Sequence, residues 1–344
     1  MHSSEPLITI LMPARNPNLR LLLAALQSVL SQSCPQWHLS IILDDGSFTG
    51  KDAALIRMVV DELGLQKDPR LSLLANESTP LTGALNTGMR HAASPYVCVL
   101  HCDDLLDQCA IRVLNSYIEA HPQVDYFHSS HLVIDGEGRP LSSIVRARES
   151  FALSDFKDLS LIKHLHCWKV ESALRIGGMD ESLQVNGSDD YDFPWCMAEA
   201  GFTFMAISEC LYYYRDHREH FRLTTHVPLD RQLSELRKIW TKHGLTDGEI
   251  EAQTERRIKG YLRQVLYANE QDRLSHSRPM RGKVTSQAPI RTALDVSESQ
   301  YAKGKITHPP GSYGIRHGLS YNRGCSKLRA VPGTSSQAGL QLST

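Results

Sequence analysis

The chain has 344 residues, 41% of them hydrophobic, enough to bury a large core in one domain or two. Its formal net charge of -1 argues against a general nucleic-acid-binding protein. That balance is uneven, because residues 271–344 carry 11 Lys and Arg against 3 Asp and Glu. No uncharged apolar run approaches the roughly 18 residues of a membrane-spanning helix, and the polar N-terminus is not typical of a signal sequence.

The eight cysteines show no Cys-x-x-Cys spacing and lie mostly in apolar runs. We therefore expect reduced core cysteines in a cytoplasmic protein.

The first part of the chain alternates short apolar strands with amphipathic helices. Strands are expected at 7–12, 39–43, 71–75 and 96–100, with helices from 19 to before Pro35, at 51–63 and at 82–92. This alternation predicts an α/β fold with a parallel, doubly wound sheet. Ligands of such sheets bind at the carboxyl ends of the strands, where the polar clusters of this sequence fall.

The second part has a different pattern. It predicts a hairpin at 126–145, helices near 154–165, 170–176 and 190–200, strands at 204–208 and 211–215, and amphipathic helices at 229–243 and 247–268. From about residue 271, Ser, Gly, Pro and Arg dominate, which predicts a disordered basic tail.

Three acidic pairs stand out: Asp44-Asp45, Asp103-Asp104 and Asp189-Asp190. Carboxylates are costly to place near one another unless a cation is present. The repetition is typical of a site that binds a cation and a nucleotide diphosphate, as in a nucleotide-sugar-dependent transferase. Each pair also has a structural alternative, either a strand-ending turn or a helix cap. That alternative is weakest for Asp103-Asp104, which follows a buried strand directly.

Six short motifs follow one another between residues 6 and 217. They are Pro13-x-x-Asn16, Asp44-Asp45-Gly46-Ser47, Asn86-x-Gly88, His101-x-Asp103-Asp104, Gly177-Gly178-x-Asp180 and Gly187-Ser188-Asp189-Asp190-Tyr191-Asp192. In this order they resemble glycosyltransferase family 2, and the ending Tyr212-Tyr213-Tyr214-Arg215-Asp216-His217 resembles its bacterial O-antigen and capsule-type members. The resemblance implies a GT-A fold, with a Rossmann-like, mostly parallel central sheet flanked by helices.

On this basis we expect a glycosyltransferase domain at 1–226, a helical extension at 227–270 and the tail at 271–344. The nucleotide-sugar half would cover about 1–107 and the acceptor half about 108–226.

The resemblance also implies roles for individual residues. The nucleotide sugar would be bound by Pro13, Ala14, Arg15, Asn16, Asp44, Asp45, Asn86 and Asp103. A divalent cation, Mn²⁺ or Mg²⁺, would be held by Asp103, Asp104, His101 and His217, and would neutralise the leaving diphosphate. His101 stands where the family usually has an aspartate, and imidazole accepts Mn²⁺ better than Mg²⁺.

On the acceptor side, Asp190 would be the general base and Asp189 its neighbour or an acceptor contact. Glu is the commoner residue at the Asp189 position. His166, Trp168 and Gly178 are further acceptor candidates, although core packing is an equal alternative for His166 and Trp168. His128 and His131 are interpreted as hairpin residues.

The expected function is inverting transfer of one sugar from a UDP-, GDP- or dTDP-linked donor to a hydroxyl acceptor. The acceptor would be a sugar or a lipid-linked molecule, in cell-surface polysaccharide or glycoconjugate synthesis. The basic tail could contact the inner face of the membrane. Two alternatives stay open. One is a nucleotidyltransferase, although residues 11–19 lack the glycine-rich loop that it needs, and the other is an inactive nucleotide-binding scaffold.

Overall fold

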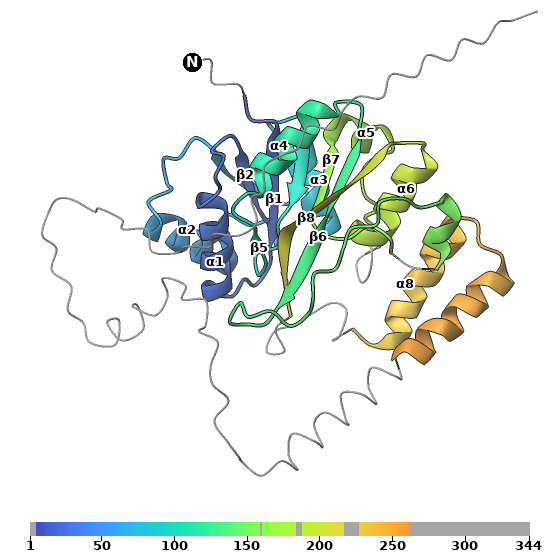
Figure 1. The fold of residues 1–344 in the computed structure, drawn as a ribbon. Helices are drawn as coiled ribbons and strands as arrows, with labels where there is room; N and C mark the ends of the chain where they lie inside the picture. The colour runs from blue at the N-terminus through green and yellow to red at the C-terminus, as the bar shows by residue number, and fades with distance from the viewer. Residues whose placement is uncertain (1–4, 159, 184–187, 217–226, 262–344) are drawn as a thin grey trace, which may run out of the picture. The chain divides into compact units, whose positions relative to one another are not determined.

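The computed structural model describes residues 5–158, 160–183, 188–216 and 227–261 (Figure 1). Its centre is one eight-stranded sheet in the order β3-β2-β1-β4-β7-β6-β8-β5. Only β7 and β5 run antiparallel to their neighbours. The mostly parallel α/β sheet expected from the sequence is confirmed.

The first part of the chain forms the elements that its periodicity predicted. They are β1 (Ile8–Ala14), α1 (Leu19–Leu30), β2 (His38–Leu43), α2 (Lys51–Glu62), β3 (Leu71–Ala75), α3 (Thr82–Arg90) and β4 (Tyr96–Val99). The α1 helix begins where the Asn18 side chain accepts a hydrogen bond of 3.2 Å from the amide of Leu21. This N-cap satisfies one of the amides that the first turn leaves unpaired.

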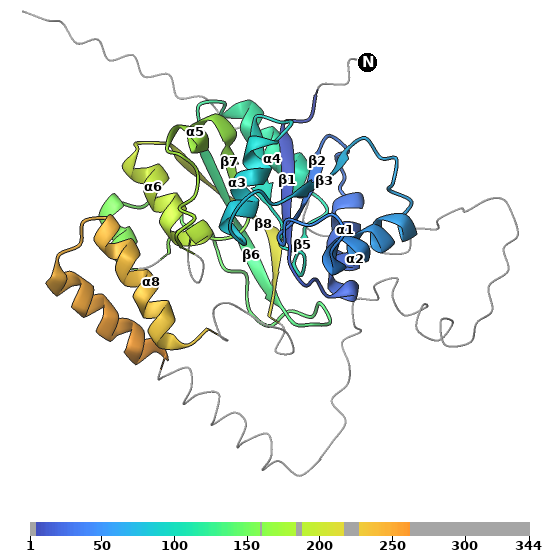
Figure 2. The ribbon, with the colours of Figure 1, turned by 180° about the vertical axis from the view of Figure 1, so that it is seen from behind.

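Helices cover both faces of the sheet (Figures 1 and 2). Ile10 and Met12 of β1 pack with residues of α1, α2 and α4 (Ala110–Ala120). Leu11, between them, belongs to the opposite core, with residues of α3, α5 (Val170–Arg175), α6 (Phe193–Glu199) and α8 (Leu229–Lys242). Successive side chains of a strand point to opposite faces, so β1 is buried on both.

The remaining elements are β5 (Leu105–Leu106), β6 (Tyr126–Ile134), the 3₁₀ turn η1 (Leu153–Lys157), β7 (His166–Lys169), the π-helical turn η2 (Ser188–Asp192) and β8 (Phe204–Arg215). Residues 247–261 are helical. The return arm of the expected hairpin makes only isolated bridges to β6, and the two expected late strands are one strand, β8.

The helix predicted near 154–165 is wrong. Only the η1 turn is helical, and the following chain enters β7, which the sequence did not predict. Leu165 packs in one core, whereas Leu161 and Ile162 pack in the other. In an amphipathic helix these residues would all be buried on one face of the helix. Here they pack into the two cores on opposite sides of the sheet instead.

The helix predicted from Asp190 begins later. Residues 188–192 form the π-helical turn, and α6 starts at Phe193 with Pro194 in its first turn. Proline has no amide hydrogen, so it cannot donate to the carbonyl of Asp190, and it favours the first turn of a helix. That carbonyl instead accepts a hydrogen bond of 2.6 Å from the Ser160 hydroxyl.

In α8, Leu236, Ile239 and Trp240 pack in the same core as α6. The boundaries proposed at 226 and 270 stay predictions, and the basic tail lies outside the described residues. Within the described ranges, no helix is both long and apolar enough to cross a bilayer.

Candidate active site

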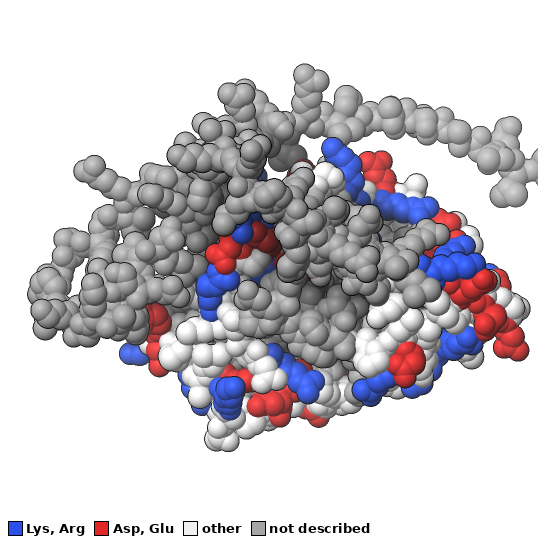
Figure 3. Space-filling view, turned by 90° about the horizontal axis from the view of Figure 1, so that it is seen from below, with Lys and Arg blue, Asp and Glu red and all other residues white. Residues whose placement is uncertain are grey.

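The polar motifs of the first half meet at one end of the sheet. In the order β2-β1-β4 these three strands are parallel neighbours, so their carboxyl ends lie side by side. They are followed by Asp44-Asp45, Arg15-Asn16 and residues 101–104, and we call these three segments the carboxyl edge. Viewed from below, the described surface carries acidic and basic side chains close together (Figure 3).

A backbone hydrogen bond holds the loop after β1 in place. Pro13 and Ala14 are buried, whereas Arg15 and Asn16 are exposed. The Asn16 amide donates a hydrogen bond of 2.7 Å to Asp52, a buried carboxylate in the first turn of α2. The φ of Asn16 is 44°, a left-handed conformation that asparagine tolerates better than most residues. Pro13 and Ala14 therefore shape the edge, and Arg15 offers a charged side chain there.

Asp44 is buried and is held in place by the chain. Its carboxylate accepts hydrogen bonds from the Leu81 amide at 2.7 Å and the Asn76 amide group at 3.2 Å. Burial raises the pKa of Asp44, and these two hydrogen bonds together with the positive charge of Arg15 oppose that shift. Leu81 adopts a φ of 53°, a strained conformation of the kind that concentrates at functional sites.

Asp45 is exposed beside Asp44. Its carboxylate accepts a hydrogen bond of 3.0 Å from the Ser47 amide, which closes the turn after β2. A Cβ atom on Gly50 would lie 2.6 Å from the second Asp45 oxygen, so Gly50 leaves room for this carboxylate. The turn and the polar site are therefore compatible explanations of the same motif.

The two aspartates after β4 have different environments. Asp104 is 2% exposed, and its carboxylate accepts hydrogen bonds of 2.7 Å from the Tyr212 hydroxyl and 2.6 Å from the Arg215 amide. Burial, and then the nearby charge of Asp103, raise its pKa to about 7. Asp104 thus ties the loop to β8, whereas Asp103 is only half-buried.

Arg215 holds the loop that carries Asp103. Its guanidinium donates to the carbonyl of Asp103 at 2.7 Å and to those of Asp135 and Gly136 at 3.0 Å each. Burial lowers the pKa of Arg215, and the neighbouring aspartates oppose that shift. The sequence predicted no role for Arg215, although it lies in a motif that carried the resemblance.

The protein groups at the carboxyl edge that could bind a divalent cation are few. Asp103 and His101 offer oxygen and nitrogen donors at the carboxyl edge, and Asp104 is engaged with β8. Within the described ranges, the edge does not bring three possible protein ligands within 4.8 Å of one another. Mg²⁺ commonly takes one or two carboxylates together with substrate phosphates, which matches this sparse set.

Asn86, in α3, is buried, and its side chain is hydrogen-bonded to the 178–181 loop. Its amide group donates to the Met179 carbonyl at 3.0 Å and to Glu181 at 2.8 Å, and its oxygen accepts from the Met179 amide at 2.9 Å. Gly178 has a φ of 79°, and a Cβ there would lie 2.6 Å from the Asn86 oxygen. Asn86 and Gly178 therefore join α3 to the 178–181 loop, and Glu181 is a member of this network that the sequence did not indicate.

Five histidines gather where β4, β7 and β6 adjoin. This histidine cluster consists of His101, His128, His131, His164 and His166. The ring of His164 lies 4.6 Å from that of His166, 5.9 Å from that of His101 and 6.3 Å from that of His131. Strand pairing places His128 opposite His166. The sequence interpreted His128 and His131 as hairpin residues and assigned no role to His164, because only the pairing of distant strands brings them together.

Four imidazoles of the cluster are kept neutral by burial. Burial lowers the pKa of His128 and of His131 to about 4, and it lowers the pKa values of His164 and His166 as well. His166 Nδ1 lies 3.0 Å from the Tyr126 hydroxyl. Among the described residues, no hydrogen-bond partner is found for His166 Nε2 or for Nδ1 of His128, His131 and His164. Neutral imidazoles can accept or donate a hydrogen bond, as a sugar hydroxyl requires.

Trp168 lies in the core beside this cluster. It is fully buried, it stacks on Tyr126, and its indole donates to the sulfur of Met89 at 3.1 Å. The structure thus favours the packing alternative for Trp168 over an acceptor contact.

The candidate base Asp190 lies half-buried in the η2 turn, joined through its carbonyl to Ser160. It is not the N-terminal residue of a regular helix, because Asp192 takes that position in α6. The backbone of Asp189 lies in the same turn, whereas His217 falls outside the described residues.

Sequence comparison places the chain among known proteins. The family described as Glycosyl transferase family 2 matches residues 9–167. An uncharacterized protein of Sinorhizobium fredii, y4gI, is 27% identical over 192 residues, which cover 54% of this chain and 20% of that protein. The match thus spans about a fifth of that relative's length.

The fold is similar to that of solved glycosyltransferase structures. Residues 1–349 of TarS from S. aureus, in complex with UDP-GlcNAc, align with a TM-score of 0.51 at 15% identity, covering 72% of this chain and 70% of that one. A mannosyltransferase from Pyrobaculum calidifontis, in complex with GDP-Man and Mn²⁺, aligns with a TM-score of 0.49 at 15% identity, over 74% and 69%. Residues 9–167 of the chain thus match glycosyltransferase family 2, and its sheet has the GT-A fold.

Proposed function

We propose that the chain is an inverting glycosyltransferase that moves one sugar from a nucleotide sugar to a hydroxyl acceptor. The observation that carries this proposal is the carboxyl edge, where Arg15, Asp44-Asp45 and Asp103 follow three adjacent parallel strands. Ligands of open α/β sheets bind outside such strand ends. Neither packing nor turn formation requires all three polar segments at one place.

The carboxyl edge would bind the donor. Asp45, exposed after β2, would accept hydrogen bonds from the base or the ribose, and the buried Asp44 would hold the Leu81 backbone in place beside it. Arg15 would contact the diphosphate, since a guanidinium matches phosphate geometry. Asn16 and Asp52 keep the β1 loop in the conformation that presents Arg15.

Asp103 and His101 would hold a divalent cation, Mn²⁺ or Mg²⁺, together with the phosphates of the donor. Bound there, the cation would supply neutralisation of the charge that develops on the leaving diphosphate. Arg215 and Asp104 would keep Asp103 in position through the hydrogen bonds between its loop and β8.

Asp190 would act as the general base. The acceptor oxygen attacks the anomeric carbon, its proton passes to the Asp190 carboxylate, and the bond to the diphosphate breaks on the opposite face. One displacement of this kind inverts the anomeric centre. The transition state has oxocarbenium character, as in glycoside hydrolysis.

The acceptor would lie between Asp190 and the histidine cluster, where neutral imidazoles can bind sugar hydroxyls. We propose cell-surface polysaccharide or glycoconjugate synthesis as the setting, with a sugar or lipid-linked acceptor. All seven cysteines of the described ranges are free thiols, which supports a reducing compartment such as the cytoplasm.

A panel of UDP-, GDP- and dTDP-linked sugars, each with and without Mn²⁺, tests the donor class by thermal unfolding. One nucleotide should stabilise the protein, by about 2.7 kcal/mol at a hundred times its dissociation constant. The same donor should undergo slow hydrolysis without an acceptor, releasing the nucleoside diphosphate. Asp103→Asn should weaken both effects, whereas the exposed carboxylate of Asp61 in α2 provides the control variant Asp61→Asn.

The outcomes separate the alternatives. Binding without hydrolysis or transfer would favour an inactive scaffold. Release of pyrophosphate from a nucleoside triphosphate and a sugar phosphate would favour a nucleotidyltransferase. No stabilisation by any member of the panel would contradict the donor site itself.

A further inference from the structure

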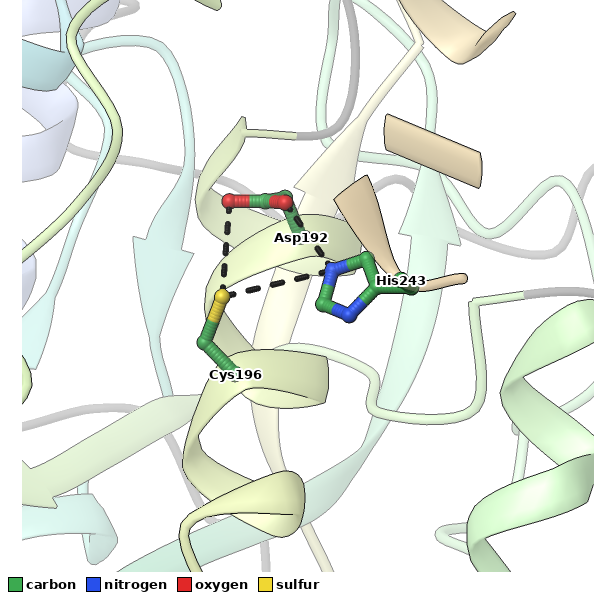
Figure 4. Close-up of side chains that lie close together, drawn as sticks. All are labelled: Asp192, Cys196 and His243. Atoms are coloured by element: carbon green, nitrogen blue, oxygen red, sulfur yellow. Dashed lines mark hydrogen bonds and ion pairs between the residues drawn. The ribbon is translucent and has the colours of Figure 1, made fainter. Parts of the chain in front are cut away.

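We propose that Asp192, Cys196 and His243 form a binding site for a borderline-soft divalent cation of the Zn²⁺ class, where α6 meets the end of α8 (Figure 4). One ligand atom from each residue lies within 4.8 Å of the other two. Within the described ranges no other group of three does so. The site is separate from the carboxyl edge in its residues and in its donor set.

The spacing of the three donors is close to that of a metal site. His243 Nε2 lies 3.1 Å from Asp192 Oδ1 and 4.0 Å from Cys196 Sγ, and that sulfur lies 3.8 Å from Asp192 Oδ2. Tetrahedral Zn²⁺ binds oxygen and nitrogen at about 2.0–2.1 Å and sulfur at about 2.3 Å, which puts its ligand atoms roughly 3.3–3.6 Å apart. Small side-chain shifts would therefore close the set around an ion, with each residue giving one ligand atom.

Regular elements hold these side chains. Asp192 and Cys196 are four residues apart, at the N-cap and in the first turns of α6, so they project from the same face. His243 follows α8 directly, and its ring stacks on Trp195 with 3.9 Å between centroids and 4° between planes. The His243 side chain is fully buried. Donors fixed by helices and by stacking lose little freedom when a metal binds.

The surroundings supply the outer contacts that metal sites use. His243 Nδ1 lies 2.9 Å from a Glu199 oxygen, close enough for an ion pair although the angle is outside hydrogen-bond geometry. A metal-binding histidine usually presents its second nitrogen to a carboxylate in this way. Lys242 lies 2.8 Å from Asp192 Oδ2 and would be an outer contact of that carboxylate. With a thiolate, two carboxylates and one ammonium around it, a divalent ion would be neutralised.

The same contacts also suit a protonated histidine, so a metal must displace protons to bind. Burial alone would lower the pKa of His243, but its hydrogen bonds to Asp192 and Cys196 and its contact with Glu199 raise it to about 9. Metal binding requires a neutral imidazole and a thiolate, so it would compete with protons for these ligands. An ion pair of His243 with Asp192 has no need of Cys196, whereas a metal site does.

Titration of the full chain with Co²⁺ and Zn²⁺ tests the site. Co²⁺ at equimolar concentration should produce the charge-transfer absorption of a cobalt–thiolate bond together with the visible bands of tetrahedral cobalt, and Zn²⁺ should remove both. Cys196→Ser and His243→Gln should abolish these bands and weaken Zn²⁺ binding by more than about 100-fold, beyond the loss for an outer contact. Cys34→Ser and His91→Gln, at a cysteine and a histidine outside the group, should change neither.

Either of two results would overturn the inference. Absence of the thiolate band in the folded wild-type protein, or Zn²⁺ affinity unchanged in Cys196→Ser, would show that the three residues form an ion cluster and no metal site. If a ligand variant fails to fold, Glu199→Gln decides instead, with an expected loss of Zn²⁺ affinity of roughly 10–100-fold. No transferase assay is involved, so the test stands apart from the proposed function.

Discussion

The carboxyl edge and the histidine cluster adjoin and share His101, yet the chain holds their other polar side chains in different ways. At the edge, Asp44 and Asp104 each accept two hydrogen bonds from the chain. In the cluster, four imidazoles have a ring nitrogen without a hydrogen-bond partner among the described residues. The loops of the edge are therefore anchored by Asp44 and Asp104, whereas the cluster retains hydrogen-bonding capacity.

This difference suggests that the two regions bind different substrates. A preorganised edge suits the donor, which presents the same nucleotide and diphosphate in every reaction, and preorganisation reduces the cost of binding. Neutral imidazoles that can either donate or accept suit the hydroxyl groups of an acceptor. The predictions below test whether the two regions differ in this way.

The largest effect is expected at Asp190. Replacing it by asparagine keeps the size of the side chain but removes the base, so turnover should fall roughly 10²-fold or more. Donor binding should be nearly unchanged, because the edge is separate from the η2 turn. Rates of transfer and donor affinities measured on the same preparation test both statements.

Asp189→Asn is the control for this prediction and should reduce turnover less. Turnover near the wild-type rate in Asp190→Asn would place the base elsewhere and would remove η2 from the acceptor site.

Asp103 and Asp104 should respond in opposite ways to alanine. Asp104→Ala leaves the Tyr212 hydroxyl and the Arg215 amide without their buried acceptor, at a cost of about 1–3 kcal/mol each. Asp103→Ala keeps the carbonyl that binds Arg215, so stability should hold while Mn²⁺-dependent donor affinity is lost. Denaturant unfolding and calorimetric titration measure the two effects. Equal loss of stability in both variants would contradict the distinct roles.

Two adjacent glycines give a matched pair. Gly178 has a φ of 79° and no room for a Cβ beside Asn86, whereas Gly177 has a φ of 85° and no atom within 4 Å of its Cβ position. Both alanine variants carry backbone strain of about 1–3 kcal/mol. Gly178→Ala should lose more stability, because it also displaces Asn86. Equal midpoints of urea unfolding would show that the contact of Gly178 with Asn86 does not restrict this loop.

The two regions should also give opposite dependence of stability on pH. The pKa of His131 falls from 6.5 to about 4 on folding, mainly by burial, so the unfolded chain binds more protons between these values and stability is lost as pH falls. The pKa of Asp104 rises from 3.8 to about 7, so the folded chain binds more protons and stability falls as pH rises.

Each group contributes at most about 1.4 kcal/mol per pH unit between its two pKa values. The four histidines outnumber Asp104, so the wild-type protein should lose stability on acidification between pH 6 and 4.5. Asp104→Asn should steepen that loss, and His131→Gln should reduce it. Unfolding free energies measured across this pH range test the prediction. Identical slopes of unfolding free energy against pH in the three proteins would contradict both pKa shifts.

The sequence predicted the first half of the fold well, since each element there carries its own signal. Strands such as Tyr96–Val99 are short apolar runs, and α1 combines an N-cap at Asn18 with apolar periodicity. The expected topology alone predicted at which end of the sheet Asp44 and Asp103 lie. Local pattern and global fold agree in this region.

The second half could not be predicted in the same way. The segment before His166 packs residues into both cores, which no single periodicity describes. The opposite environments of Asp103 and Asp104 depend on Tyr212 and Arg215, more than a hundred residues away along the chain. The histidine cluster and the group of Asp192, Cys196 and His243 arise in the same manner from pairing and packing of distant elements.

The central claim is that the carboxyl edge binds the nucleotide diphosphate through a cation at Asp103. Anomalous diffraction from crystals soaked with Mn²⁺ and the donor identified by thermal unfolding tests it most directly. The account predicts a manganese peak within bonding distance of the Asp103 carboxylate and of the diphosphate, with the base beside Asp44 and Asp45. A nucleotide bound away from these residues, or manganese found only at Asp192, Cys196 and His243, would contradict it.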